Sequence, residues 1–292
     1  MKAVAWTKYG KPADALQIIN IEKPKPNKFE VLIKVHSSTV TAGDVRLRAF
    51  KVPTGFWLPT RIAFGFFKPR KNIIGMDFSG VVEAIGKNVT LFNIGDVVYG
   101  TSGMHLSANA EYICLTEKSV FIKKPENISH KYAVASLFGG QTAIHFLKEK
   151  AKLHAGQKIL INGASGSVGT ASIQLAKYLG AEVTGVCSSD NIELIKSLGA
   201  NKIIDYTKEN IEYSQETYDI VLDCIGNFPL SKCRKLLNNN GKLISINAGL
   251  LTNLSAIVNK RLISGVASES KVYLEYLKEL TETGHMTTEV VK

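Results

Sequence analysis

The stretch from Ile159 to Gly169, Ile-Leu-Ile-Asn-Gly-Ala-Ser-Gly-Ser-Val-Gly, constrains the fold of this chain more than any other. A short apolar run followed by closely spaced glycines predicts a strand that turns sharply into a helix, whose first N–H groups face an anion. Ala164, Gly166 and Gly169 fall on the G-x-G-x-x-G pattern of dinucleotide-binding turns, with alanine in place of the first glycine. The stretch therefore predicts a phosphate-binding turn.

Residues on both sides of this turn complete a β-α-β unit. Residues 158–161 form the strand before it, and Ala171 and Leu175 fall on one face of a helix predicted over 170–179. A second strand follows at 182–186. A glycine-rich loop alone would be weak evidence, whereas this unit is typical of a dinucleotide-binding domain.

After this unit, strands and helices alternate, which predicts a doubly wound parallel sheet. The predicted strands cover residues 202–204, 218–222, 242–246 and 263–266. The predicted helices cover 191–198, 230–237 and a final stretch in which Tyr273, Tyr276, Leu277 and Leu280 share one face before Gly284.

The first part of the chain has a different pattern. Short strands are predicted at 2–7, 15–21, 31–35, within 75–86, and at 96–100, 110–115 and 120–123, which together favour a small barrel-like β domain. A helix is predicted from Ser129 onward, with a break at Gly139 and Gly140. The segment 50–70 is rich in Phe, Trp and Pro without a period, so it is either a mobile cover over a pocket or a packed loop.

Length and amino-acid composition limit the kinds of protein that this chain can be. A chain of 292 residues with 45% hydrophobic residues can bury a large core, and this length favours two domains. No apolar run reaches the ~18 residues that cross a bilayer, and charge begins too early for a signal peptide, so we expect a cytoplasmic protein. The four cysteines form no C-x-x-C pair, which predicts free thiols and no metal site.

The formal net charge of +11 is compatible with a nucleic-acid partner. The Lys and Arg residues are dispersed, however, and the densest cluster covers only 68–71. A dispersed excess is typical of solvated surface, or of a field that attracts a ligand with several phosphates. We therefore expect a small-molecule partner in preference to a nucleic acid, and no membrane partner.

Seven short motifs are spread over nearly the whole chain. They are Thr41-Ala-Gly-Asp44, Gly75-Met-Asp-Phe-Ser-Gly80, Gly95-Asp96, Gly140-Gln-Thr-Ala143, the turn from Gly163 to Gly169, Leu198-Gly-Ala200 and Ile204-Asp-Tyr206. In this order they resemble the medium-chain dehydrogenase/reductase superfamily, and within it the zinc-free quinone oxidoreductase-like branch that includes zeta-crystallin. The resemblance implies an α/β protein with a GroES-like, partly open β-barrel domain over residues 1–125 and a doubly wound Rossmann domain over 126–292. The first would carry the catalytic and substrate site, and the second would bind NAD(P).

The chain departs from the zinc-dependent members of the superfamily. Those members place a cysteine near position 41 and a His-Glu pair after the glycine at 75, whereas this chain has Thr41, Met76 and Asp77. Their four-cysteine lobe is missing as well. Because methionine and threonine do not replace imidazole and thiolate as zinc ligands, we expect no zinc.

The end of the sequence also departs from the family. Members usually continue beyond the glycine at 284 with a strand and a helix that return to the first domain, whereas this sequence stops at Lys292. The resemblance thus leads us to expect a chain that is shorter by roughly thirty residues than a typical pair of such domains. We expect the shorter end to leave either a weakened catalytic lobe or a more open cleft.

The end of the second strand bears on the choice of cofactor. An acid there would bind the ribose of NAD, but residues 186–191 read Val-Cys-Ser-Ser-Asp-Asn, so Ser188 and Ser189 can donate to the 2′-phosphate of NADP. Related NADP enzymes often carry a cation in place of Asp190, which is a candidate N-cap here. NADP(H) is therefore favoured over NAD(H). The resemblance implies cofactor contacts from Thr142, Ala164, Ser165, Gly166, Ser167, Val168, Gly169, Ser188, Ser189, Asn191, Tyr206 and Ile225.

The resemblance implies hydride transfer from a nicotinamide to a quinone or an α,β-unsaturated carbonyl. Without zinc, hydrogen-bond donors must polarise the carbonyl, and Thr41 and backbone N–H groups are candidates. Asp44 is a candidate acid or base, although it more simply fixes the turn. Thr142 is expected beside the cofactor, with a plain helix-interior role as the alternative.

Two other functions stay open at this point. One is a zinc-free NAD(P)-dependent reductase of aldehydes or ketones, similar to alcohol dehydrogenases. The other is a non-enzymatic family member that binds nucleic acid or has a structural role. The resemblance is also compatible with a homodimer.

Overall fold

The second half of the chain forms a parallel sheet of six strands in the computed structural model, which describes residues 1–211 and 214–288. The strands are β8 (Lys158–Asn162), β9 (Glu182–Cys187), β10 (Lys202–Asp205), β11 (Tyr218–Asp223), β12 (Leu237–Ser245) and β13 (Leu262–Ser264). Their order is β10-β9-β8-β11-β12-β13, so the strand order reverses between β8 and β11. This confirms the predicted doubly wound sheet. Ligands of such sheets bind beyond the C-terminal strand ends at that reversal.

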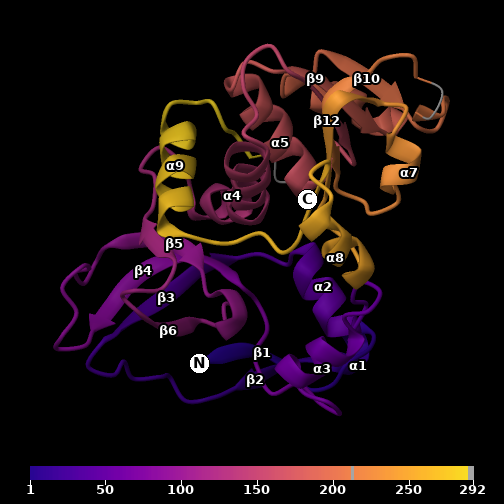
Figure 1. Cartoon of the computed structure of the whole chain (residues 1–292). Helices are drawn as coiled ribbons and strands as arrows, with labels where there is room; N and C mark the ends of the chain where they lie inside the picture. The colour runs from indigo at the N-terminus through magenta and orange to yellow at the C-terminus, as the bar shows by residue number, and fades with distance from the viewer. Residues whose placement is uncertain (212–213, 289–292) are drawn as a thin grey trace.

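Helices cover this sheet on both faces (Figure 1). They are α5 (Ser167–Tyr178), α6 (Ile192–Ser197), α7 (Leu230–Cys233) and α8 (Leu250–Val258). The last helix, α9 (Lys271–Glu282), instead packs against the helix at 130–143 and the strand at 121–123. The helix predicted over 230–237 is wrong in its second half. Tyr218 N donates to Leu236 O at 2.7 Å, and Leu237 pairs with Tyr218, so these residues already join the sheet. The sequence reasoning also missed α8.

The first half contains an antiparallel sheet of five strands in the order β6-β3-β4-β5-β7, which confirms the predicted β domain. Its strands are β3 (Glu30–Ser38), β4 (Asp77–Ile85), β5 (Val97–Thr101), β6 (Tyr112–Thr116) and β7 (Phe121–Lys123). The predicted N-terminal hairpin is present as β1 (Lys2–Trp6) and β2 (Leu16–Asn20), with the short helix α1 (Pro12–Ala15) between them. The inward-facing residues Ile33, Phe78 and Phe121 build the core of this half.

The segment 50–70, which had no readable period, contains a helix. Helix α2 (Ala42–Ala49) comes first, and α3 (Trp57–Phe64) follows it. The guanidinium of Arg61 lies 3.7 Å from the ring centre of Phe50 and 4.3 Å from that of Tyr9, which anchors α3 by cation–π contacts. Residues 50–70 do not line the cavity described below, and the side chains of Trp57, Leu58 and Ile62 in α3 are exposed, so neither the cover nor the packed loop is confirmed.

The long helix α4 (His130–Ala143) runs without the predicted break and continues as a π-helical stretch, Ile144–Ala151. The paired glycines are explained by close packing. A Cβ atom at Gly139 would lie 2.2 Å from Ser167 O at the start of α5, and one at Gly140 would lie 2.7 Å from the Leu277 side chain in α9. Tertiary contact, not helix termination, therefore requires small residues here.

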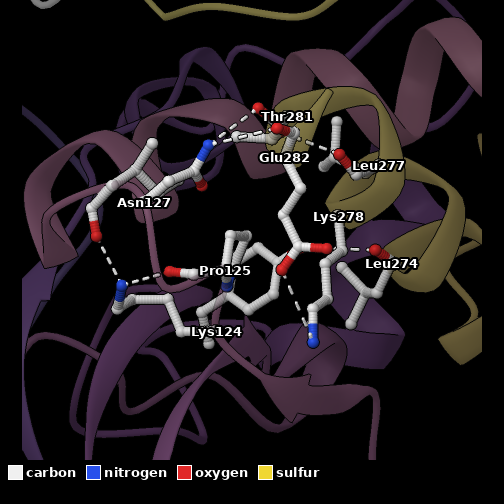
Figure 2. Close-up of polar contacts among 10 residues, drawn as sticks. Lys124, Pro125, Asn127, Leu274, Leu277, Lys278, Thr281 and Glu282 are labelled. Atoms are coloured by element: carbon white, nitrogen blue, oxygen red, sulfur yellow. Dashed lines mark hydrogen bonds and ion pairs between the residues drawn. The ribbon is translucent and has the colours of Figure 1, made fainter. Parts of the chain in front are cut away.

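Helix α9 ties the two halves of the chain together. Figure 2 shows Asn127, which precedes α4, donating from Nδ2 to the carbonyl oxygens of Thr281 at 3.3 Å and Glu282 at 3.5 Å. Tyr99 in β5 donates from its hydroxyl to Leu274 O at 3.2 Å. The domain boundary between residues 125 and 126 stays a prediction, and residues 289–292 of the second expected domain lie outside the described residues.

Candidate functional site

A cavity of about 650 Å³ lies between the two halves of the chain. On one side it is lined by the turn after β8 and by the ends of β11 and β12, and on the other by the start of α2 and one side of α4. It thus opens at the reversal of strand order, where doubly wound sheets bind their ligands.

The glycine-rich turn after β8 has two different kinds of glycine. Gly163 has a φ of +82°, which favours glycine, and a Cβ atom at Gly169 would lie 2.3 Å from Gly163 O. These two glycines let the turn close on itself. Gly166 differs, because the nearest protein atom to a Cβ atom there would be Gly163 O at 3.6 Å. Since Gly166 lines the cavity, its side stays open for a ligand to approach the backbone.

A buried carboxylate shapes the neighbouring strand end. Asp223, the last residue of β11, accepts hydrogen bonds from Asn162 Nδ2 at 2.9 Å, Ile225 N at 3.1 Å and Gly226 N at 3.0 Å. These bonds link the ends of β8 and β11. They also hold Ile225 at the cavity wall.

Thr41 and Asp44 form a capping box at the start of α2. Thr41 donates to Asp44 Oδ2 from its backbone N at 2.8 Å and from Oγ1 at 2.7 Å, and Asp44 N donates to Thr41 Oγ1 at 3.2 Å. This confirms the turn-fixing role of Asp44. Burial raises the pKa of the Asp44 carboxyl, while its bonds from Thr41 lower it. As long as Asp44 is ionised, the hydroxyl proton of Thr41 is engaged and cannot polarise a carbonyl.

Asp77 lies just behind this capping box and is fully buried. Its carboxylate accepts from Thr39 Oγ1 at 3.3 Å. Burial, together with the negative charges of Glu269 and Asp44, raises its pKa to about 8. Within residues 1–211 and 214–288, no group of three or more His, Cys, Asp or Glu residues could hold a metal ion.

Ten of the twelve predicted cofactor residues fall into two separate groups. Those that line the cavity are Ser165, Gly166, Ser167, Val168, Gly169 and Ile225, and Thr41 faces them from the other wall. A second group lies outside the lining, where β9 and β10 end. There Asn191 Nδ2 donates to Ser188 Oγ at 2.9 Å, Ser189 Oγ donates to Asp205, and Tyr206 N donates to Cys187 O at 3.1 Å.

Three further predicted site residues do not reach the cavity surface. Ala164 is fully buried beneath the turn, and Asp44 lies under Thr41. Thr142 donates from its hydroxyl to Phe138 O at 2.7 Å inside α4, as its helix-interior alternative required. The expected N-cap at Asp190 is wrong, because the 3₁₀ turn Ser189–Asn191 begins after Ser188 and α6 begins after Asn191.

Sequence reasoning missed several residues of the cavity wall. Arg46 and Asn247 face each other across it, and Met286 and Thr287 reach it from beyond α9. Gln174 in α5 holds this last segment, because its Oε1 accepts from Thr287 N at 2.8 Å and its Nε2 donates to Thr287 O at 3.0 Å. Only Arg46 had a readable signal, since it shares one helical face with Ala42 and Gly43 of the motif at 41–44.

Comparison with known proteins agrees with this architecture. The family "Alcohol dehydrogenase GroES-like domain" matches residues 27–126, and "Zinc-binding dehydrogenase" matches residues 167–283. The chain is 31% identical to a chloroplast envelope quinone oxidoreductase homolog from Arabidopsis thaliana, over 99% of this chain and 89% of that protein. It is 33% identical to a chloroplastic NADPH-dependent alkenal/one oxidoreductase from Arabidopsis thaliana, over 84% of this chain and 62% of that protein.

A solved structure supports the same relationship. The quinone oxidoreductase from Coxiella burnetii has a TM-score of 0.84 and 28% identity to this chain, and the match covers 98% of this chain and 88% of that one. The parallel sheet, the antiparallel β domain and the glycine-rich turn occur in the expected order along the chain. The chain therefore belongs to the medium-chain dehydrogenase/reductase superfamily, in its quinone oxidoreductase-like branch.

Proposed function

We propose that this protein is an NADPH-dependent, zinc-independent oxidoreductase that transfers hydride to a quinone or an α,β-unsaturated carbonyl. The observation that carries the proposal is the cavity between the glycine-rich turn and the α2 wall. Such a cavity can hold a dinucleotide on one side and a small substrate on the other. The names of the relatives from Arabidopsis thaliana support the substrate class.

The glycine-rich turn fits a dinucleotide. The open side of Gly166 leaves room for a pyrophosphate, and the backbone N–H groups of Ser167, Val168 and Gly169 begin α5 with no intrahelical acceptor. When bound, the nicotinamide would supply the hydride. The protein would position it against the substrate, with Thr41 and Ile225 on either side of the cavity.

The preference for NADPH rests on the strand ends of β9 and β10. Ser188 accepts from Asn191, so its own hydroxyl proton is left to donate to a 2′-phosphate. Hydrogen bonds from Ser189 and Thr207 hold the pKa of Asp205 well below its ordinary value, and Lys208 Nζ lies 3.4 Å from this carboxylate. That pairing limits the repulsion that Asp205 would exert on a phosphate near Tyr206.

A catalytic zinc does not fit the residues at the α2 wall. Thr41 and Met76 offer no thiolate or imidazole, and the buried carboxyl of Asp77 is already hydrogen-bonded to Thr39. The absence of zinc therefore remains part of the proposal.

The cellular compartment is a separate part of the proposal. Among the described residues, Cys114, Cys187 and Cys224 form no disulfide, which supports a reducing compartment, and we propose the cytoplasm. None of the described helices is long and apolar enough to cross a membrane.

Titration with NADPH and NADH, followed by turnover with a quinone, an enal and a saturated aldehyde, tests the proposal. We expect NADPH to bind more tightly than NADH, and only the quinone and the enal to be reduced. Reduction of the saturated aldehyde alone would instead support the aldehyde and ketone reductase. If neither nucleotide binds, the enzyme proposal fails, and salt-sensitive RNA binding would then support the non-enzymatic alternative.

A further inference from the structure

Arg46 is the one charged side chain among the described residues that line the cavity. It lies on the side of α2 that also carries Ala42 and Gly43, three and four positions earlier, and it is half-buried. Because Asp and Glu are absent from the described part of the lining, its positive charge has no counter-ion there. A partly desolvated cation without a partner is suited to an anionic oxygen.

The other hydroxyl donors on this wall are already engaged. Thr39 Oγ1 donates to Asp77 at 3.3 Å, Thr41 Oγ1 donates to Asp44 at 2.7 Å, and Ser136 Oγ donates to Ala133 O at 2.8 Å. Each hydroxyl has a single proton, so none is left for a substrate. A guanidinium carries five N–H donors, and Arg46 Nη1 uses one of them on Asn247 Oδ1.

Asn247 fixes the direction of this guanidinium. Its Nδ2 donates to Cys224 O at 2.7 Å, at the end of β11, so its Oδ1 is turned toward Arg46. The side chain of Arg46 is thereby held across the cavity by the opposite wall. Asn247 is a positioning residue in this arrangement, and the remaining N–H groups of Arg46 are left for a ligand.

We propose that Arg46 forms an oxyanion-binding subsite that holds the carbonyl oxygen of the substrate, an inference that rests on the proposed function. Hydride transfer breaks the C4–H bond of the reduced nicotinamide and forms a C–H bond at the β-carbon of an enone. The electron pair of the C=C bond then forms a double bond between the α-carbon and the carbonyl carbon, and the C=O π pair moves to the oxygen; the nicotinamide would be oxidised in this step. Arg46 stabilises the resulting enolate until water protonates its α-carbon and leaves as hydroxide.

The test compares R46Q and R46K with R234Q, which removes an exposed arginine outside the cavity. The first readout is binding of p-nitrophenolate, an enolate-like anion with visible absorption, to the protein in buffer alkaline enough to keep the phenol ionised. The others are the Kd of NADPH and kcat with an enal. We expect R46Q to weaken phenolate binding and to lower kcat by about 10²-fold, as for the loss of an oxyanion donor. R46K should retain part of the phenolate affinity and part of kcat, and R234Q should match the wild type in all three readouts.

A second variant guards against a misfolded R46Q protein. N247D places a carboxylate against Arg46 with little change in size, so it should also weaken phenolate binding. Unchanged phenolate affinity in R46Q and N247D would overturn the inference. A weakening of NADPH binding as large as that of phenolate binding would also overturn it, because Arg46 would then bind a cofactor phosphate. If wild-type protein reduces neither quinone nor enal, the proposed function fails, whereas Arg46-dependent phenolate binding would still support the subsite.

Discussion

The two walls of the cavity are built on different principles. The wall at the glycine-rich turn offers backbone N–H groups and an open approach at Gly166, so its chemistry belongs to the main chain. The α2 wall offers side chains, and the hydroxyls of Thr39 and Thr41 are already bound within the protein. The main-chain wall therefore suits the pyrophosphate of a cofactor. On the α2 wall, recognition of the substrate depends on one side chain, that of Arg46.

The largest effect is expected from Gly166→Val on the main-chain wall. A valine side chain would project into the cavity and block the approach of a pyrophosphate. We expect NADPH affinity to fall by about 10²-fold or more, because one or two charge-assisted hydrogen bonds of about 1.5–3 kcal/mol each are lost. Isothermal titration calorimetry measures this loss, and the melting temperature should stay unchanged.

Gly169→Ala is the matched comparison within the same turn. Its Cβ atom would lie 2.3 Å from Gly163 O and 2.6 Å from Ala164 O, so the turn itself would have to shift. This variant should lower the melting temperature. A normal melting temperature in Gly169→Ala, or normal NADPH affinity in Gly166→Val, would show that the two glycines do not have the roles assigned to them.

On the side-chain wall, Asp44→Ala removes the capping box of α2. We expect the free energy of unfolding to fall by about 1–2 kcal/mol, since the Thr41 N–H loses its acceptor. Urea unfolding measures the change. NADPH affinity should be nearly unaffected, because the opposite wall binds the cofactor. A large loss of NADPH affinity without a loss of stability would contradict the separation of the two walls.

The pH dependence of stability tests the buried carboxyl behind the same wall. The pKa of Asp77 is raised by burial to about 8, above its ordinary value. The folded state therefore binds a proton that the unfolded state has lost. This contribution to stability is fully present below an ordinary carboxyl pKa of about 4 and is lost as the pH rises toward about 8.

Urea unfolding of wild type and Asp77→Asn over that pH range measures the effect. Asparagine cannot ionise and keeps an oxygen for the Thr39 hydroxyl, so the variant should show a flatter decline in the free energy of unfolding with rising pH. Parallel curves for the two proteins would mean that Asp77 is charged throughout.

The smallest effect is expected outside both walls, from Tyr99→Phe. This substitution removes the hydrogen bond from the Tyr99 hydroxyl to Leu274 O, which joins β5 to α9. Thermal and urea unfolding should show a loss of about 1 kcal/mol, with NADPH affinity and kcat unchanged. Impaired turnover would indicate that the α9 contact positions the cavity walls.

Much of the fold could be predicted because its signals are local. The strand, turn and helix around Gly166 follow one another directly, and alternating apolar segments specify a parallel sheet. The paired glycines at 139 and 140 misled the prediction, because a local rule reads them as a break. In the structure, their lack of side chains admits Ser167 and Leu277 from distant segments.

The sequence by itself determined the phosphate-binding turn, the order of the strands along the chain and the lack of zinc-type ligands at Thr41 and Met76. Only the tertiary structure decided which side chain of the α2 wall has hydrogen-bond donors left for a ligand. Arg46 and Asn247 are 201 positions apart, and their contact depends on how the two halves pack. The glycine-rich turn is formed by residues that are neighbours in the sequence. The α2 wall depends on long-range packing, which no local sequence pattern encodes.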